Sequence, residues 1–298
     1  MLSAAQHEAV TSEAARPLQI LAGPGSGKTR VLTSRVAHLV RDSAAPIAPE
    51  RCVVVTFTNR AANEMRARLE TMIGADRTRR LVLGTFHAVC VRFLRRWGTR
   101  LGLDPRFTIA DTDDARRLLR DVDRDAPVDA TLAAISRAKA HGWTPDELRA
   151  SAQHAPGSPA HTEHLALCRT YAAYQQQLRT SHALDFDDLL LLGVRLFREH
   201  PELTTHIDHV LVDEFQDTNA VQYELLRRLS RHVSVVGDPD QSIYSWRHAD
   251  VRHIERMHLD FPGLHRVLLE ENYRSTPQIL DAALSVMQQD PLRIPKGL

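Results

Sequence analysis

The feature that most constrains the fold is a glycine-rich turn that directly follows a short, largely apolar stretch near the N-terminus. Residues 18–21 (LQIL) are typical of a buried strand, and residues 22–29 (AGPGSGKT) form the turn. From Thr29 to Val40, apolar residues recur with a helical period. A strand that passes through a tight turn into a helix is a building unit of parallel sheets covered by helices. The sequence therefore predicts an α/β fold.

Two further strand–helix units follow. Residues 52–57 (CVVVTF) are almost continuously apolar, as expected for a strand whose sheet is covered on both faces. Asn59 is expected to cap the next helix, which extends to about Ile73. Residues 81–85 predict a third strand, followed by a helix to about Leu101. Repeated alternation of strand and helix favours a parallel sheet with helices on both faces.

The pattern becomes helical between about residues 90 and 205 and then returns to strands. Residues 153–162 contain two prolines and a glycine and predict a loop. The predicted helices are 111–124, 130–141, 145–152, 165–180 and 186–199, and the later strands are 210–212, 233–236 and 265–269. We therefore expect an α/β core, formed by 1–89 and 206–270, interrupted by an all-helical insertion at 90–205.

Composition sets limits on the class of protein. The chain has 298 residues, 43% of them hydrophobic, and a formal net charge of only +1, so any nucleic-acid binding must use a local groove. Cys52, Cys90 and Cys168 are far apart and form no C-x-x-C pair, which favours free thiols over disulfides or zinc. No apolar run reaches transmembrane length. These features predict a soluble intracellular protein, in the nucleus if eukaryotic or the cytoplasm if bacterial.

The glycine-rich turn has the pattern of a P-loop, with Ala22 where the common pattern has glycine. Its glycines allow backbone N–H groups to face phosphate oxygens. Lys28 is expected to reach the β- and γ-phosphates, and Thr29 to bind Mg²⁺. The alternative is a turn without a ligand, which Gly-Lys-Thr after a strand disfavours. The expected phosphate-binding residues are Ala22, Gly23, Pro24, Gly25, Ser26, Gly27, Lys28 and Thr29.

Further polar residues follow the later strands. Asp213 and Glu214 follow an apolar strand, so Asp213 is expected to hold Mg²⁺ through water and Glu214 to orient or deprotonate the attacking water. The alternative is a solvated acidic turn that caps the next helix, and for Asp217 capping is an equally good explanation. Gln241 can contact the γ-phosphate, and Arg274 can stabilise the transition state. A surface salt bridge is the alternative for Arg274.

A second group of residues suits nucleic acid. Tyr244, Trp246 and Arg247 lie in one turn-like stretch, and aromatic stacking with nearby cations is how proteins bind single strands without sequence preference. Anchoring of Trp246 in the core is equally compatible with the sequence. Polar groups that follow strands also suit phosphate contacts, although a threonine or histidine there is commonly a helix cap or a satisfied polar group. They include Thr58, Asn59, Thr85 and His87.

These motifs resemble the UvrD/Rep/PcrA family of superfamily 1A DNA helicases. The segments that carry the resemblance span nearly the whole chain: AGPGSGKTR, VVTFTNRAANEM, LGTFHAVC, LDFDDLL, VDEFQDTN, VVGDPDQSIYSWR and ENYRST. Two segments, LQILAGPGSGKT and FTIADTDDARRLL, look closest to a fungal anti-recombinase branch. The resemblance implies a RecA-like P-loop NTPase domain, with ATP bound in a cleft between two such domains. It also implies Mg²⁺ and ATP as cofactors and single-stranded DNA as partner.

The resemblance also assigns roles to single residues. It implies that Gln6 reads the adenine edge, that Tyr273 stacks on adenine and that Arg30 lies beside the nucleotide. It places Gln241 and Arg274 at the γ-phosphate. It implies a single-strand path lined by Phe57, Thr58, His87, Tyr244, Trp246 and Arg247. Asp185, Asp187 and Asp188 lie in a recurrent family segment, but we interpret them mainly as helix-start residues.

Two departures from the family pattern affect these expectations. His248 stands where the family usually has glycine, which affects the placing of Trp246. The chain also ends at Leu298, so residues 271–298 are expected to be only the start of a second RecA-like domain in an N-terminal fragment or truncated product.

The sequence therefore predicts the N-terminal part of an ATP-dependent 3′–5′ single-stranded DNA translocase or helicase that acts in DNA repair, recombination or replication. It is expected to be monomeric in isolation, to bind strand junctions and to have repair or recombination proteins as partners. The alternative is an ATP- and strand-binding module with little turnover. A fragment of a helicase–nuclease fusion is a third interpretation.

Overall fold

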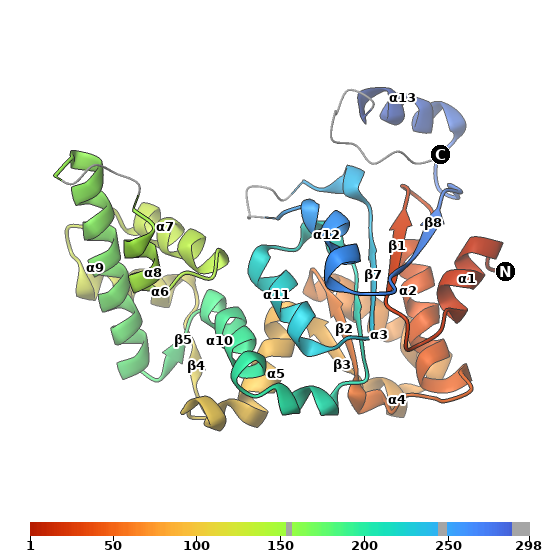
Figure 1. The fold of residues 1–298 in the computed structure, drawn as a ribbon, viewed down its shortest axis with the longest axis horizontal. Coiled ribbons are helices and arrows are strands. Elements are labelled where there is room, and N and C mark those ends of the chain that lie inside the picture. Colours follow the sequence, from red (N-terminus) through yellow and green to blue (C-terminus); the bar gives the residue numbers. More distant parts are fainter. Residues whose placement is uncertain (153–156, 244–248, 288–298) are drawn as a thin grey trace. The chain divides into compact units, whose positions relative to one another are not determined.

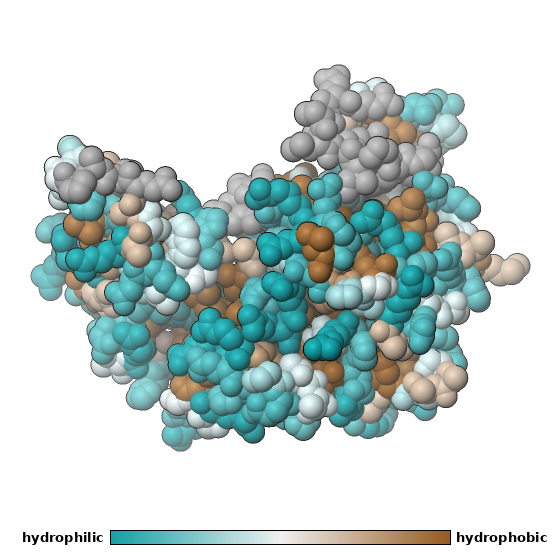
Figure 2. Space-filling view, viewed as in Figure 1, coloured by the Kyte–Doolittle hydropathy of each residue, from teal (hydrophilic) through white to brown (hydrophobic). Residues whose placement is uncertain are grey.

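The computed structural model describes residues 1–152, 157–243 and 249–287, and the chain divides into two compact units. Unit 1 comprises Met1–Val89, Pro201–Asn219 and Leu226–Leu298, and unit 2 comprises Cys90–His200 and Ala220–Leu225. Each unit has its own hydrophobic core. Side chains on the face shown in Figure 2 are mainly hydrophilic, with scattered apolar patches.

Unit 1 is built on a six-stranded sheet in the order β3-β2-β6-β7-β1-β8 (Figure 1). Every pair of neighbouring strands is parallel. The parallel sheet predicted from strand–helix alternation is therefore confirmed. The strands are β1 (Leu18–Ala22), β2 (Cys52–Thr56), β3 (Val82–Thr85), β6 (His209–Val212), β7 (Val233–Gly237) and β8 (His265–Leu269).

Helices cover both faces of this sheet, which explains why β1, β2, β6 and β7 are buried at every position. On β1, Leu18 and Ile20 join a core with α1 (Ala4–Thr11), α2 (Lys28–Ala37) and α3 (Asn59–Ile73). Gln19 points to the opposite face, where its amide donates to Ile254 O of α12 (Arg252–Asp260) over 2.6 Å. The other helices of this unit are α4 (Ala75–Arg80) and α13 (Pro277–Met287).

Unit 2 is helical apart from one short pair of parallel strands, β4 (Thr108–Ile109) and β5 (Ala183–Leu184). The prediction of an all-helical segment is wrong in one detail, because two residues of β4 pair with two residues of β5. Most of its helices match predicted ranges: α6 (Thr112–Val122), α7 (Val128–Ala140), α8 (Pro145–Ala150), α9 (Pro159–Thr180) and α10 (Phe186–Glu199). Helices α5 (Phe86–Trp97) and α11 (Ala220–Leu229) each contribute residues to both units.

Several predicted boundaries are wrong by a few residues for local reasons. Helix α9 begins at Pro159, within the predicted loop, because Ser158 caps it and proline suits the first turn. Thr58 rather than Asn59 caps α3, since the Thr58 hydroxyl accepts from the Ala61 N–H over 3.1 Å. Helix α5 ends at Trp97 and continues as a 3₁₀ turn. Helix α2 ends at Ala37 and continues as a π-turn, His38–Asp42.

The start of α10 combines a helix cap with a buried ion pair. Asp185 is the N-cap and forms a capping box with Asp188, as the helix-start interpretation predicted. Both carboxylates also accept from the ammonium of Lys139, over 2.6 and 2.8 Å, and the Lys139 side chain is fully buried. These charges raise the pKa of Lys139 despite its burial. Nothing in the sequence indicates this contact of Lys139, which ties α7 to α10.

The state of the cysteines and the prediction of no transmembrane segment can be compared with the structure. Cys52, Cys90 and Cys168 are free and buried, in agreement with the prediction of unpaired thiols. Within residues 1–152, 157–243 and 249–287, no helix is both long and apolar enough to cross a membrane.

Candidate nucleotide site

The carboxyl ends of the six parallel strands share one edge of the sheet, and most of the candidate residues follow those ends. The P-loop follows β1, which lies between β7 and β8. Asp213 and Glu214 follow β6, Asp238 to Gln241 follow β7, and residues 270–275 follow β8. Ligands of open parallel sheets bind outside the carboxyl ends of the strands. The fold therefore gathers these segments at the edge where a ligand is expected.

The P-loop requires glycine at two positions. Gly25 and Gly27 have φ angles of +67° and +85°, which other residues rarely adopt. The Ser26 hydroxyl donates to Gly23 O over 2.7 Å and holds the loop in a compact form. Lys28 is the first residue of α2 and Thr29 lies in its first turn, so both are at the positive end of that helix. Ala22, in contrast, ends β1 and is completely buried, so no glycine is needed there.

Gln6 lies against the P-loop. It is 3% exposed, and its amide donates to Ser26 O over 2.9 Å. Its oxygen accepts from the Ser3 N–H, which completes the capping box of α1. A Cβ at Gly27 would lie 3.0 Å from the Gln6 nitrogen, so the close packing depends on glycine.

The segment after β8 also packs on the P-loop. The Tyr273 N–H donates to Gly25 O over 3.0 Å, and the Asn272 amide donates to Pro24 O over 2.6 Å. A Cβ at Gly25 would lie 2.8 Å from the Arg274 Cβ, which places the backbone of Arg274 beside the loop. The described residues contain no carboxylate in an ion pair with Arg274, so the salt-bridge alternative gains no support from them. Arg274 and Tyr273 are both exposed at this edge.

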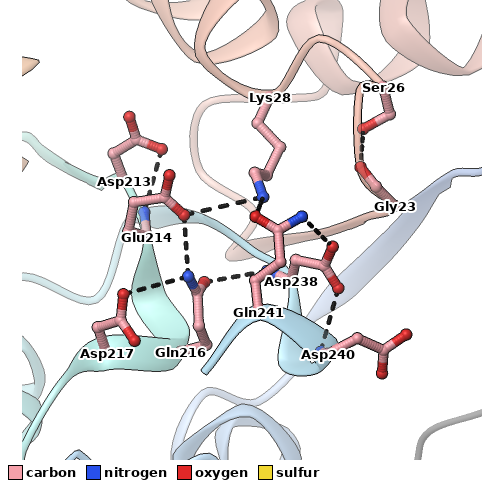
Figure 3. Close-up of polar contacts among 10 residues, drawn as sticks. All are labelled: Gly23, Ser26, Lys28, Asp213, Glu214, Gln216, Asp217, Asp238, Asp240 and Gln241. Atoms are coloured by element: carbon pink, nitrogen blue, oxygen red, sulfur yellow. Dashed lines mark hydrogen bonds and ion pairs between the residues drawn. The ribbon is translucent and has the colours of Figure 1, made fainter. Parts of the chain in front are cut away.

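Lys28 joins the segments that follow β6 and β7 (Figure 3). Its ammonium donates to Gln241 Oε1 over 3.0 Å and lies 3.8 Å from Glu214 Oε2. The Gln241 amide in turn donates to Asp238 Oδ2 over 2.6 Å. A lysine of the P-loop, a carboxylate and an amide from three different strand ends therefore meet at one point.

Asp213 and Glu214 differ sharply in environment. Asp213 is 4% exposed, so the alternative of a solvated acidic turn is wrong for this residue. Burial, and then the charge of Glu214, raise the pKa of Asp213 to about 7. Glu214 is partly exposed and has φ +50° and ψ +46°, a left-handed conformation that is uncommon for a residue other than glycine. Backbone strain of this kind is concentrated at functional sites.

Gln216 and Asp217 complete this cluster, and the sequence assigned no role to Gln216. The Gln216 amide donates to Glu214 Oε2 over 2.9 Å and to Asp217 Oδ2 over 3.3 Å. Asp217 is 6% exposed, and its other oxygen has no hydrogen-bond partner. Burial and the Glu214 charge raise the pKa of Asp217 to about 6. Gln216 lies within VDEFQDTN, a segment that carries the family resemblance, and this is the sequence signal that could have singled it out; its contacts come from the fold.

Arg30 lies at the rim of the site. It is exposed on the first turn of α2, and its guanidinium donates to Met1 O over 3.2 Å. The Tyr273 hydroxyl hydrogen-bonds to the Glu271 carboxylate. Neither residue is buried, so both side chains can rearrange around a ligand.

The candidate strand-binding residues lie at the ends of β2 and β3. These strands are neighbours with Thr56 opposite Thr85, so the residues that follow them are close together. Thr58 and Asn59 are exposed, and Thr58 and Thr85 both accept from N–H groups of the next helix, as the capping alternative predicted. Burial lowers the pKa of His87 and favours its neutral form. Tyr244, Trp246, Arg247 and His248 lie outside the described residues.

Comparisons with known proteins identify the family. A family model described as the UvrD/REP helicase N-terminal domain matches residues 2–262. The chain is similar to the ATP-dependent DNA helicase PcrA of Leuconostoc citreum, with 43% identity over 296 residues that cover 95% of this chain and 38% of that protein. PcrA of Staphylococcus epidermidis strain RP62A is 40% identical over 312 residues, which cover 100% of this chain and 41% of that protein.

PcrA of Staphylococcus aureus strain Mu50 is 40% identical over 308 residues, which cover 98% of this chain and 40% of that protein. The chain thus spans about two fifths of the length of these curated relatives. The relatives are bacterial and give no support to a nuclear protein, while the likeness of two segments to a fungal branch stays a prediction. The family resemblance and the RecA-like fold class predicted from the motifs are confirmed, and the chain belongs to the UvrD/REP helicase family through its N-terminal domain.

Proposed function

We propose that this chain is the N-terminal part of an ATP-dependent DNA helicase that moves 3′ to 5′ on single-stranded DNA. The observation that carries the proposal is the meeting of Lys28, Glu214 and Gln241 at the carboxyl edge of the sheet. A P-loop lysine, a candidate base and a candidate γ-phosphate sensor are the parts that ATP hydrolysis requires. The printed names of the relatives, which describe ATP-dependent DNA helicases, support the same activity.

The phosphates would lie against the loop of residues 22–29. Gly23, Gly25 and Gly27 leave room for close approach, and the start of α2 favours negative charge. The buried carboxylate of Asp213 and the hydroxyl of Thr29 are the hard oxygen ligands that Mg²⁺ prefers, so these residues fit the ion. Mg²⁺ would supply charge neutralisation at the β- and γ-phosphates.

The hydrolysis step would use residues already in contact. Glu214 would orient and deprotonate the attacking water, because its carboxylate is held beside Lys28 by Gln216. Gln241 would contact the γ-phosphate after Lys28 turns to the nucleotide. Arg274 would bring positive charge to the transition state from the segment packed on the P-loop.

The base of the nucleotide would lie between the rim residues. Gln6 would read the adenine edge with the amide that now donates to Ser26 O, Tyr273 would stack on adenine, and Arg30 would lie beside it. The exposure of Tyr273 and Arg30 supports this arrangement.

The DNA strand would cross the same edge of the sheet over β2 and β3. We assign Phe57, Thr58, Asn59, Thr85 and His87 to this path, with Tyr244, Trp246 and Arg247 on the evidence of the sequence alone. Residues 1–89 and 206–270 would be the first motor domain, 90–205 its insertion, and 271–298 the start of the second motor domain. We further propose that the protein is intracellular and binds strand junctions and repair or recombination proteins. This chain is proposed to be monomeric in isolation.

ATP hydrolysis by the 298-residue chain, with and without single-stranded DNA, tests the proposal. The Glu214→Gln variant serves as the blank, because it keeps the size of the side chain but removes the base. We expect turnover above the blank that rises with DNA, and we expect Lys28→Ala to abolish it. Equal rates for the unsubstituted chain and the blank would contradict hydrolysis by this chain.

A binding module with little turnover is the second candidate, and the short coverage of the relatives favours it. Fusion to the C-terminal part of a family relative distinguishes the two. A gain in turnover on extension, with nucleotide binding already present in the short chain, would support the module. Absence of a gain would count against it.

A further inference from the structure

Five residues at the candidate nucleotide site form a closed ring of contacts, in which Asp238 takes part through both its side chain and its backbone N–H. Starting from Lys28, the ring passes to Gln241 over 3.0 Å and from Gln241 to Asp238 over 2.6 Å. The Asp238 N–H donates to Gln216 Oε1 over 3.0 Å, and the Gln216 amide donates to Glu214 Oε2 over 2.9 Å. Glu214 closes the ring at 3.8 Å from the Lys28 ammonium (Figure 3).

Gln216 is the member that bridges two strand ends through both halves of its amide. Its nitrogen holds the segment after β6, and its oxygen holds the backbone after β7. A second link runs in parallel, since the Ser242 hydroxyl donates to Gln216 O over 3.3 Å. Gln216 is 2% exposed, so no solvent competes for these bonds.

The neighbouring sequence is shaped to accept this side chain. A Cβ at Gly237 would lie 2.8 Å from Gln216 Oε1 and 3.2 Å from its backbone nitrogen, so a residue other than glycine at the end of β7 would displace it. Two carboxylates, Glu214 and Asp217, accept from the same Gln216 nitrogen, which fixes which end of the amide faces them.

We propose that Gln216 is a positioning residue for ATP hydrolysis, which couples the carboxylate of Glu214 to the segment from Asp238 to Ser242 that carries Gln241. The inference rests on the proposed function, because it assigns Glu214 and Gln241 to the hydrolysis step. When Lys28 leaves Gln241 for a phosphate, the hydrogen bonds of Gln216 keep Glu214 and the segment that carries Gln241 in the same positions relative to each other. Gln216 itself touches no phosphate and acts only through its two neighbours.

Gln216→Met tests this role, because methionine fills a similar volume but cannot donate to Glu214 and offers the Asp238 N–H only a weak sulfur acceptor. We expect kcat to fall by about 10²-fold, as for misplacement of a catalytic group, while the Kd of a non-hydrolysed ATP analogue changes less than about threefold. The assay uses the 298-residue chain, or its extended form if turnover requires extension.

Gln19→Met is the matched control. Gln19 is also a fully buried glutamine whose amide bridges different elements. It donates to Ile254 O and to Met257 Sδ and accepts from Arg266, and none of these residues belongs to the ring. We expect the kcat of this variant to stay within about threefold of that of the unsubstituted protein, because the loss of a buried glutamine elsewhere leaves the site intact. A further cycle combines Gln216→Met with Gln241→Ala, whose effects should be less than additive if they act through one unit.

Three results would overturn the inference. They are an unchanged kcat in Gln216→Met, a kcat loss matched by Gln19→Met, and full additivity with Gln241→Ala. Failure of the proposed function looks different, because then the unsubstituted protein would hydrolyse ATP no faster than Glu214→Gln. That outcome would remove both proposals, whereas the first three leave the proposed function standing.

Discussion

At the scale of single residues, the site combines backbone strain with unfavourable charge. Glu214 has positive φ, and Asp213 and Asp217 are buried carboxyl groups close to it. Each feature lowers the stability of the folded protein, and each places a group where the proposed chemistry needs it. The candidate nucleotide site is therefore a local weakness of unit 1.

The strain at Glu214 predicts that a glycine variant is more stable than an alanine variant at this position, which is the reverse of the usual order. Glu214→Gly and Glu214→Ala both remove the carboxylate and should both abolish turnover. Because glycine adopts positive φ without steric penalty, we expect Glu214→Gly to be more stable than Glu214→Ala by about 1 kcal/mol. Urea unfolding of the two proteins measures the difference. If the alanine variant is the more stable one, the left-handed conformation is not retained in solution.

The raised pKa of Asp213 predicts a dependence of stability on pH. In the folded protein this carboxyl has a pKa of about 7, so it binds a proton more tightly than in the unfolded chain. The contribution of Asp213 to stability is therefore complete below about pH 4 and is lost as pH rises to about 7, at about 1.4 kcal/mol per pH unit. Asp217, with a pKa of about 6, adds an effect of the same sign.

Urea unfolding from pH 5 to 8, without Mg²⁺ and nucleotide, checks this prediction. Asp213→Asn keeps the acceptor for the Glu214 N–H, which the wild-type side chain binds over 3.0 Å. We expect the variant to lose part of the pH dependence below pH 7 and to be more stable than the wild type above it. Parallel stability curves for the two proteins would contradict the raised pKa.

At the scale of elements, the sequence predicted strands better than helix ends. The predicted strands at 210–212, 233–236 and 265–269 are strands in the structure, each within one residue at either end. For the first two, the limits follow from burial on both faces, which composition reveals, whereas in β8 only Val267 and Leu269 are buried. Helix ends depend on which single residue caps, as Thr58 and Ser158 show, and competing polar residues stand next to each other there.

Contacts between elements were beyond the reach of the sequence. Lys139 has no feature that distinguishes it from a surface lysine until α10 brings Asp185 and Asp188 to it. Gln216 stands within the motif VDEFQDTN, but only the pairing of β6 with β7 connects it to Asp238. The motifs were predictable because their spacing reflects a ligand, whereas the contacts of Lys139 and Gln216 reflect packing.

The packing of α5 against α10 predicts that replacing Gly193 by alanine lowers stability, although glycine inside a helix is ordinarily the less stable of the two residues. A Cβ at Gly193, inside α10, would lie 2.8 Å from Cys90 Sγ. Gly193→Ala should therefore destabilise unit 2 by about 1 kcal/mol, because overpacking outweighs the gain of about 1 kcal/mol in helix propensity. Denaturant unfolding followed by tryptophan fluorescence measures the change. The double variant with Cys90→Ala should recover stability, and an equal loss in the double variant would refute the steric explanation.

At the scale of the whole molecule, the last described helix lacks a core. No residue of α13 is buried, and Ile279 and Val286 are 60% and 68% exposed. Several exposed apolar side chains on one helix indicate a surface that contacts another protein segment. The chain spans about two fifths of its relatives, so further sequence in such proteins is available to cover this helix.

Extension of the chain should therefore protect α13. In a fusion to the C-terminal part of a family relative, we expect hydrogen exchange of the α13 amides to slow by at least about tenfold relative to the 298-residue chain. Helix α3, which already contributes Met65 and Leu69 to the unit 1 core, is the internal reference and should not change. Unchanged exchange in α13 would show that its exposed face is not a domain contact.

The bond between Lys28 and Gln241 has a consequence for how the site reports its own state. Under the proposed function, a phosphate can take the Lys28 ammonium only by breaking this bond, so Gln241 Oε1 would lose its donor as the phosphate binds. The Gln241 amide would stay on Asp238, so only one end of the side chain would be released. Phosphate binding would then be reported to the segment after β7 by the loss of a bond, and no new contact would have to form first.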